Sequence, residues 1–376
     1  MPQCATFFDA GQAVWPKGNP MSSNSKVIFA NQLRGVAALC VVFSHLFYVF
    51  WYARDTVANY IGASPIEGDS PNGVGIFVSA YLNTGAFGVA IFFLISGFVI
   101  PFSLSKASPV KFLVLRAIRV YPTYIVGLLF VLSVVWVSGK YWGKPFMWDA
   151  STILQNMALI NSMTETPSVD LVNWTLAIEI KFYIVASLMI FFIRRAVVWP
   201  VVVFGAAVLV ANKIHQSQLG TELVFVIYMF IGVIFNYRIR GLISKSKLVA
   251  SILCLGALSA LAWKASPWEG SLSAIGINYL YALVVFGGAF VLREVFKENR
   301  LLDFFADISF PLYVTHSLLG YSIMRFMLDK GIGLGWVMFV AFFSVICVAY
   351  ILHLFVEKPT MAAGKKLGVF VRSQPA

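Results

Sequence analysis

An arginine and a histidine, Arg34 and His45, stand eleven residues apart in an apolar stretch near the start of the chain. Eleven residues of α-helix make three turns plus roughly 20°, so both side chains share one face, about 16 Å apart along the axis. Burying an ionisable side chain inside a membrane-spanning segment costs free energy, and such residues usually have a function. Imidazole is the side chain best matched to proton transfer near neutral pH. The pair predicts acid–base chemistry inside a bilayer.

A carboxylate in another apolar stretch, Glu179, is a candidate partner for this histidine. If that stretch runs inward from the outer side, Glu179 lies roughly 8–9 Å below its outer end, at a depth similar to that of His45. A contact between them would orient the imidazole and stabilise its protonated form. The alternative is that Glu179 pairs with a basic group to satisfy its burial. Lys181 is a poor choice for that partner, because residues i and i+2 do not share a helix face.

The chain that positions these groups has the composition of a membrane protein. It has 376 residues, of which 60% are hydrophobic and 12% charged, whereas a soluble domain is about 25% charged. Its apolar runs are continuous rather than alternating, which disfavours a β-barrel, and each is long enough to cross a hydrocarbon core about 30 Å thick. We predict an all-α polytopic membrane protein of about ten transmembrane helices. The predicted spans are residues 33–53, 86–104, 121–138, 174–193, 196–212, 221–236, 248–264, 277–292, 310–328 and 335–356.

The net charge of +12 follows from the topology of such a protein. With the N-terminus in the cytoplasm, the inner segments carry twenty Lys and Arg residues and the outer segments seven, and Lys181 lies within a span. The positive-inside rule therefore places both termini in the cytoplasm. Nucleic-acid binding is not needed to explain the basic balance. The four cysteines, Cys4, Cys40, Cys254 and Cys347, show no metal-binding spacing, and we expect no metal site.

The spans divide the chain into a membrane domain at residues 31–359, with an N-terminal tail at residues 1–30 and a cytoplasmic C-terminal tail at residues 360–376. Met21 is either the natural start or part of a genuine short tail. Two longer outer loops are predicted at residues 54–85 and 139–173. The aromatic residues in the second loop either anchor the protein at the membrane interface or form a platform for a sugar ring.

The main inner loop, at residues 106–122, is basic. Arg116 and Arg119 are three residues apart, so they are neighbours on a helical face. Guanidinium pairs suit bidentate recognition of phosphate. Ordinary positive-inside anchoring explains the same spacing. Further along the chain, we expect His316 to pack in its span through a hydrogen bond.

Six short motifs, in order along the chain, resemble those of a known family. They are Arg34-Gly35-Val36-Ala37-Ala38 with His45; Phe92-Phe93-Leu94-Ile95-Ser96-Gly97-Phe98; Arg116, Arg119, Tyr121 and Pro122; Trp174-Thr175-Leu176 with Glu179, Phe182 and Tyr183; Ser309-Phe310-Pro311-Leu312-Tyr313 with His316; and Glu357-Lys358-Pro359. Over about residues 26–359 they resemble the membrane acyltransferase-3 family, bacterial integral-membrane enzymes that O-acylate sugars. The late motif departs from the family pattern by one aromatic residue, Phe310. Some members append an extracytoplasmic hydrolase-like domain, which we do not expect here because 17 residues follow Pro359.

This resemblance implies a multi-pass enzyme of the bacterial inner membrane. It would transfer an acyl group, most often acetyl from cytoplasmic acetyl-CoA, to a hydroxyl of a cell-surface carbohydrate such as an O-antigen or exopolysaccharide. Acetyl-CoA would be a co-substrate, with no tightly bound cofactor. In this chain His45 would be the general base or a transient acyl carrier, and Glu179 would orient it. Arg34 would hold the pantetheine–phosphate end of the donor or an intramembrane carboxylate.

The remaining motif residues have implied places in the same scheme. Arg116, Arg119 and Tyr121 would bind acyl-CoA at the inner face, and the acceptor would enter from the outer side. Trp174, Tyr183 and His316 belong to shared motifs without an assigned role.

Two other classes of protein fit parts of the sequence. A transporter or flippase for a glycan or a lipid-linked precursor also has many spans and intramembrane ionisable residues. No inverted repeat and no pair of Gly/Pro-broken helices supports that interpretation. A membrane scaffold without catalysis leaves the placement of Arg34, His45 and Glu179 unexplained.

Overall fold

The computed structural model describes residues 25–79, 81–105 and 107–370, and these residues form helices and no β-strand. The predicted start at Met21 and most of the predicted N-terminal tail lie outside the described residues. The α-helices are α1 (Ser25–Ser44), α2 (Phe50–Tyr52), α3 (Arg54–Tyr60), α4 (Thr84–Leu104), α5 (Pro109–Trp142), α6 (Ala150–Met157), α7 (Asn173–Leu188), α8 (Ile190–Arg194), α9 (Trp199–Ile214), α10 (Gln218–Ile239), α11 (Lys245–Lys264), α12 (Ile277–Val291), α13 (Arg300–Asp307), α14 (Ser309–Asp329), α15 (Leu334–Leu352) and α16 (Lys358–Phe370). Three π-helical segments, η1 (His45–Val49), η4 (Leu272–Gly276) and η5 (His353–Glu357), and two 3₁₀ turns, η2 (Val74–Phe77) and η3 (Glu269–Ser271), complete the described elements.

Seven helical segments of the described chain are long and apolar enough to cross a membrane, which confirms a polytopic all-α membrane protein. They are Ile28–Tyr52, Thr84–Leu104, Pro109–Trp142, Gln218–Ile239, Lys245–Lys264, Glu269–Val291 and Leu334–Lys366. Each contains most of one predicted span. The predicted span at 196–212 corresponds to the shorter apolar helix α9. Helices α7 and α14 occupy most of the other two predicted spans; both carry buried polar residues, and α7 has 16 residues.

Several predicted boundaries fall inside helices. The tail predicted at residues 1–30 contains the first turns of α1, and residues 360–370 of the predicted C-terminal tail belong to α16. Most of the predicted inner loop at 106–122 is the beginning of α5, which has 34 residues and continues through Pro122. A helix of that length extends about 50 Å, which is more than the hydrocarbon core requires.

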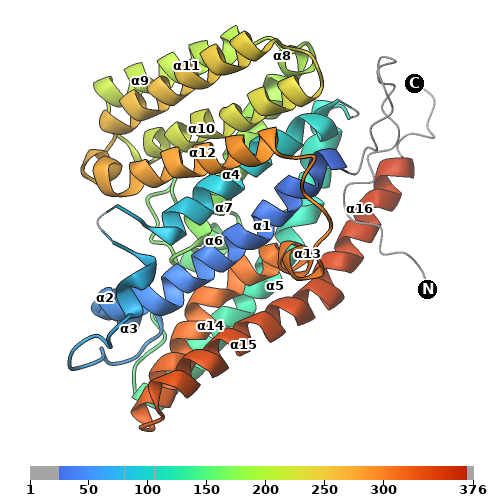
Figure 1. Ribbon diagram of the computed structural model, residues 1–376. Coiled ribbons are helices and arrows are strands. Elements are labelled where there is room, and N and C mark those ends of the chain that lie inside the picture. Colours follow the sequence, from blue (N-terminus) through green and yellow to red (C-terminus); the bar gives the residue numbers. More distant parts are fainter. Residues whose placement is uncertain (1–24, 80, 106, 371–376) are drawn as a thin grey trace.

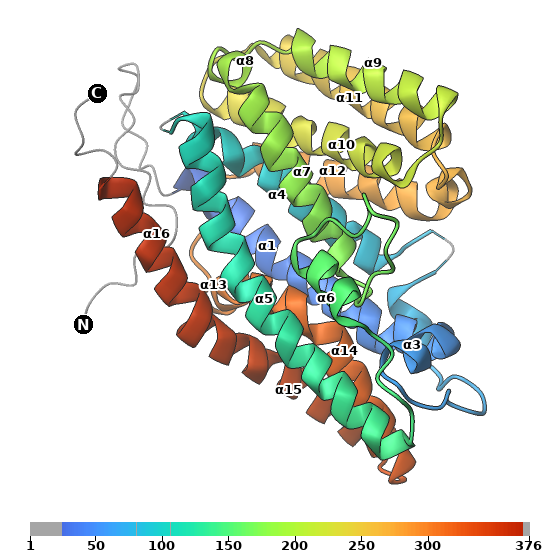
Figure 2. The ribbon, with the colours of Figure 1, turned by 180° about the vertical axis from the view of Figure 1, so that it is seen from behind.

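The helices form two groups that meet along α1 and α4 (Figure 1). Helices α9 and α11 lie side by side at one edge, and α10 and α12 separate them from α4. At the other edge α14 packs against both α5 and α15, and α16 continues the path of α15 (Figure 2). One end of this bundle carries the starts of α1 and α5. We call it the inner end, because the sequence predicts that it faces the cytoplasm.

Helices α4 and α10 approach each other closely enough for their backbones to touch. A Cβ atom built on Gly232 would lie 2.2 Å from the carbonyl oxygen of Leu94, and one built on Gly97 would lie 1.8 Å from that of Met229. Glycine is therefore the residue that lets these two backbones touch, as small residues do in membrane helix pairs. The contact seats α10, most of whose side chains are buried, against the helix that carries Ser96.

Replacing Gly232 by Ala should destabilise the protein. The added methyl group has to displace the α4 backbone, and overpacking of this kind costs about 1–3 kcal/mol. Gly256→Ala is the matched control, because Gly256 is also helical and a Cβ atom built on it would meet nothing within 4 Å. Thermal unfolding in detergent should give a lower Tm for Gly232→Ala and an unchanged or higher Tm for Gly256→Ala. Equal Tm values would contradict the close contact.

Candidate active site

Four helices bring charged and polar side chains to one small cavity of about 30 Å³ in the inner half of the bundle. Its polar lining consists of Asn31 and Arg34 from α1, Ser96 from α4, Arg116 and Arg119 from α5, and Glu179 and Tyr183 from α7. Three guanidinium groups therefore surround a volume of about one water molecule. Such a concentration of positive charge in an apolar bundle needs an anion to balance it.

Glu179 supplies negative charge to this cavity. Ser96 donates a hydrogen bond of 2.8 Å to its Oε1 atom, and the Tyr183 hydroxyl donates to the same oxygen. The carboxylate lies within electrostatic range of Arg34, and so does Glu357 at the end of η5. The Arg34 Nε atom is buried and has no hydrogen-bond partner among the described residues. The cavity thus holds a fixed carboxylate and a guanidinium with unused donor capacity.

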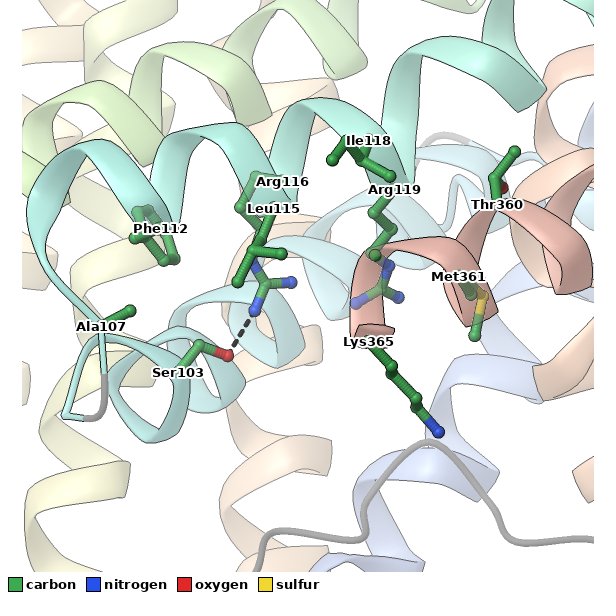
Figure 3. Close-up of a pocket in the computed structure, with 11 residues that line it drawn as sticks. Ser103, Ala107, Phe112, Leu115, Arg116, Ile118, Arg119, Thr360, Met361 and Lys365 are labelled. Atoms are coloured by element: carbon green, nitrogen blue, oxygen red, sulfur yellow. Dashed lines mark hydrogen bonds between the residues drawn. The ribbon is translucent and has the colours of Figure 1, made fainter. Parts of the chain in front are cut away.

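A second, larger cavity of about 220 Å³ shares Arg116 and Arg119 with the first (Figure 3). It lies between the end of α4, the first turns of α5, and α16. Its lining is Ser103, Ala107, Phe112, Leu115, Arg116, Ile118, Arg119, Thr360, Met361, Gly364 and Lys365. We call it the inner cavity.

Arg116 is held rigidly where the two cavities meet. Its guanidinium donates to the Ser103 hydroxyl, as Figure 3 shows. It also lies over the rings of Phe112 and Tyr183, 5.4 and 5.6 Å from their centroids. Aromatic faces stabilise a cation while leaving its in-plane donors available. Arg116 is therefore preorganised to bind an anion, and its residue is 8% exposed.

Further toward the outer end, His45 and His316 form a two-histidine contact. Their ring centroids are 4.8 Å apart and their planes nearly perpendicular. His45 Nδ1 shares a hydrogen bond of 2.5 Å with the Tyr321 hydroxyl. His45 is half-buried and begins the π-helix η1. Segments of this kind often mark functional positions.

His316 has a defined tautomer. Its Nδ1 atom lies 3.1 and 3.0 Å from the carbonyl oxygens of Leu312 and Tyr313, so it carries the hydrogen and donates it. In the neutral ring Nε2 then bears a lone pair; it is buried and has no partner among the described residues. The predicted packing hydrogen bond of His316 is confirmed, and the same residue also touches His45.

The structure separates Glu179 from His45, although their predicted depths suggest them as partners. The reason is that α7 begins inside the bundle rather than at its outer end. Asp170, three residues before α7, is buried and accepts a hydrogen bond of 2.8 Å from Ser317, the neighbour of His316. The chain is thus already level with the histidines at residue 170. From Asn173 to Glu179 the helix descends roughly 9 Å further inward, which carries the carboxylate to Arg34.

Two other predicted site residues lie away from both cavities. The Tyr121 hydroxyl donates to the carbonyl of Ala158, and the side chain lines neither cavity. Because α5 is a continuous helix, Tyr121 faces the segment before α7 rather than the arginine side. Trp174 packs its ring 5.6 Å from those of Phe225 and Trp268.

The segment at residues 158–172 is fixed by a buried ion pair. Lys181 Nζ lies 2.8 Å from Glu222 Oε2, and Ser162 bridges the pair by accepting from Lys181 and donating to Glu222. The side chains of Lys181 and Glu222 are 9% and 2% exposed. Lys181 therefore pairs across to α10 and not with Glu179, as its spacing predicted.

Replacing Lys181 by Met should lower the free energy of unfolding by about 3–5 kcal/mol, because Glu222 would be left buried and uncompensated. Lys330→Met is the control, since its partner Asp329 is 3.9 Å away and both side chains are partly exposed; it should lower the stability far less, because exposed ion pairs contribute little. Thermal unfolding in detergent compares the two. Similar losses in both variants would show that the buried pair does not fix this segment.

Sequence reasoning missed several contributors to the site. Ser96 lies inside a recognised motif, but its role as a Glu179 donor depends on how α4 faces α7. Tyr321 follows His316 by five residues, and its pairing with His45 depends on the crossing of α1 and α14. Among the described residues, no three His, Cys, Asp or Glu side chains gather where they could hold a metal ion.

Comparison with known proteins places this geometry in a family. The model of a family described as an acyltransferase domain, acyltransferase-3, matches residues 27–354. No curated protein and no solved structure matches the chain. The match covers both histidines, all three cavity arginines and Glu179, and it extends over nearly the whole described bundle. The chain therefore belongs to the acyltransferase-3 family and is a multi-pass membrane acyltransferase.

Proposed function

We propose that this enzyme moves an acetyl group from cytoplasmic acetyl-CoA to a hydroxyl of a cell-surface carbohydrate, such as an O-antigen or an exopolysaccharide. It would do so in a bacterial inner membrane, with both termini in the cytoplasm. The observation that carries the proposal is the junction of two cavities at Arg116 and Arg119, on the inner side of a half-buried histidine. Neither metal nor nucleic acid has a part in this scheme.

The donor's anionic end fits the arginine junction. Coenzyme A carries phosphates, for which paired guanidinium groups are suited through bidentate hydrogen bonds. From there the pantetheine arm extends along α1, past Arg34 toward His45. The roughly 16 Å between these two residues along the helix axis is comparable to the reach of an extended pantetheine arm. Arg34, whose Nε atom has no partner in the described part of the chain, would guide the arm past Glu179.

His45 would act as the general base. If Nδ1 carries the hydrogen and donates to Tyr321, Nε2 is free to take the proton of the acceptor hydroxyl. The hydroxyl oxygen attacks the thioester carbonyl, the carbon–sulfur bond breaks, and the thiolate of coenzyme A receives the proton from His45. If His45 instead carries the acyl group transiently, the same nitrogen is the nucleophile. In both cases His316 and Tyr321 are positioning residues that hold the imidazole.

The carbohydrate would approach from the outer end, where residues 54–79 and the end of α5 lie. Transfer at the level of the histidines spares the polar acceptor from crossing the inner half of the bundle. In this scheme Glu179 and the arginines serve the donor, and the outer segments serve the acceptor.

Glycan mass spectrometry of the native host tests the function itself. A strain lacking the gene should lose an acetyl mass increment from a surface glycan, and the wild-type gene should restore it. Unchanged acetylation with glycan accumulating inside the cell would instead support a transporter or flippase.

His45→Ala should reduce acetyl transfer by about 10²–10⁴-fold, the usual contribution of a general base, and by more if His45 carries the acyl group. The folded protein should remain in the membrane. His215→Ala is the control, since His215 is exposed after the end of α9. Coenzyme A thiol release in membrane vesicles, together with size-exclusion profiles, measures both properties. Full activity in His45→Ala would exclude this residue from the chemistry.

The double variant Arg116→Ala with Arg119→Ala should raise the KM for acetyl-CoA by about tenfold or more, because charge-assisted hydrogen bonds contribute about 1.5–3 kcal/mol each. The matched control removes two exposed lysines from the inner end of α11, by Lys245→Ala with Lys247→Ala. An equal KM in both double variants would make Arg116 and Arg119 topology anchors only.

A further inference from the structure

One wall of the inner cavity comes from a helix that the family match does not include. The match ends at residue 354, whereas Thr360, Met361, Gly364 and Lys365 of α16 line the cavity opposite α5. Figure 3 shows Thr360, Met361 and Lys365 on the helix that faces Arg116 and Arg119. The shared family region therefore builds only part of this cavity, and α16 completes it.

Helix α16 is held close to α5 at defined points. A Cβ atom built on Gly364 would lie 3.4 Å from the Ile118 Cγ2 atom, which is ordinary contact. Just before the helix, His353 Nδ1 lies 2.7 Å from Glu357 Oε2, and both side chains are buried. This pair sits in the π-helical segment η5 that joins α15 to α16. The wall is thus part of the packed bundle.

The chemistry of the cavity is divided between its two ends. Arg116 and Arg119 form its deep end, next to the smaller cavity that holds Glu179. Apolar side chains, among them Ile118 and Met361, form its sides. Lys365 lies at its rim, where Figure 3 shows the side chain extending away from the two arginines. A ligand with a flat apolar part and phosphates at more than one position matches this distribution of groups.

We propose that α16 forms half of a binding site for the adenine nucleotide of the acyl-CoA donor. The diphosphate binds at Arg116 and Arg119, the base lies between Ile118 and Met361, and Lys365 attracts the ribose phosphate at the rim. This inference rests on the proposed use of acyl-CoA. It goes further by naming the nucleotide as the part of acyl-CoA that binds in the inner cavity. Helix α16, which lies beyond the matched family region, would then help to determine which acyl donor the enzyme binds.

A pair of donors tests this assignment. Acetyl-CoA carries the nucleotide, and acetyl-pantetheine carries the same thioester without it. Gly364→Leu places a branched side chain in the inner cavity and should raise the KM for acetyl-CoA by about tenfold or more, with the kcat/KM for acetyl-pantetheine unchanged. Gly256→Leu is the matched control and should behave like the wild type, because Gly256 lines neither cavity and a Cβ atom built on it would meet nothing within 4 Å.

Lys365→Ala should raise the KM for acetyl-CoA about threefold to tenfold, as loss of a partly exposed phosphate contact does. Lys366→Ala, its exposed neighbour that does not line the cavity, should leave the KM unchanged. Adenosine 3′,5′-bisphosphate should compete with acetyl-CoA in the wild type and less well in Gly364→Leu.

The outcomes separate the inference from the function on which it rests. A wild-type enzyme that releases no coenzyme A from acetyl-CoA would overturn the proposed function. If the wild type is active but Gly364→Leu leaves both donors unaffected, or impairs both equally, α16 has no role in nucleotide recognition. Loss of acetyl-CoA use alone supports the inference.

Discussion

The balance of charge around Arg34 is the constraint on which the inner half of this protein depends. A guanidinium in an apolar helix bundle is tolerated only where an anion or a water-filled space meets it. Here α7 brings Glu179, and Arg116 and Arg119 from α5 share the same small cavity. Ser96 and Tyr183 fix the carboxylate through hydrogen bonds. Four helices are thereby tied to one electrostatic centre, and in the proposed function this centre receives the anionic end of the donor.

Irregular backbone completes the site in the outer half. The segment at residues 158–172 enters the bundle and is held there by the Lys181–Glu222 pair and by Asp170. Non-helical chain at such a depth is tolerated where protein buries its polar groups. The π-helix that begins at His45 adds a second local irregularity on α1. Both features lie beside the two histidines.

The sequence predicts the fold class well because apolar runs long enough to cross a bilayer have few other structural solutions. It also draws attention to Arg34, His45 and Glu179, because ionisable residues in or beside such runs are rare. Arg116 and Arg119 stand out instead through their spacing in a basic segment. Which of these residues contact one another depends on how deep in the membrane each helix begins. The sequence does not give that depth. The assumption that α7 begins at the outer end placed Glu179 beside His45, whereas the inward course of residues 158–172 places it beside Arg34. Likewise, the proposed role of α16 in nucleotide binding depends on its packing against α5. The composition of α16 alone does not predict a binding site.

The most direct test of the account is a structure of the protein in lipid nanodiscs with a thioether analogue of acetyl-CoA, which resists transfer. Density for the diphosphate should lie within hydrogen-bond distance of Arg116 and Arg119, and the acetyl analogue should lie against the His45 ring. Phosphate density at the outer end of the bundle, or an acetyl group held on the inner side of Glu179 and out of reach of His45, would contradict it.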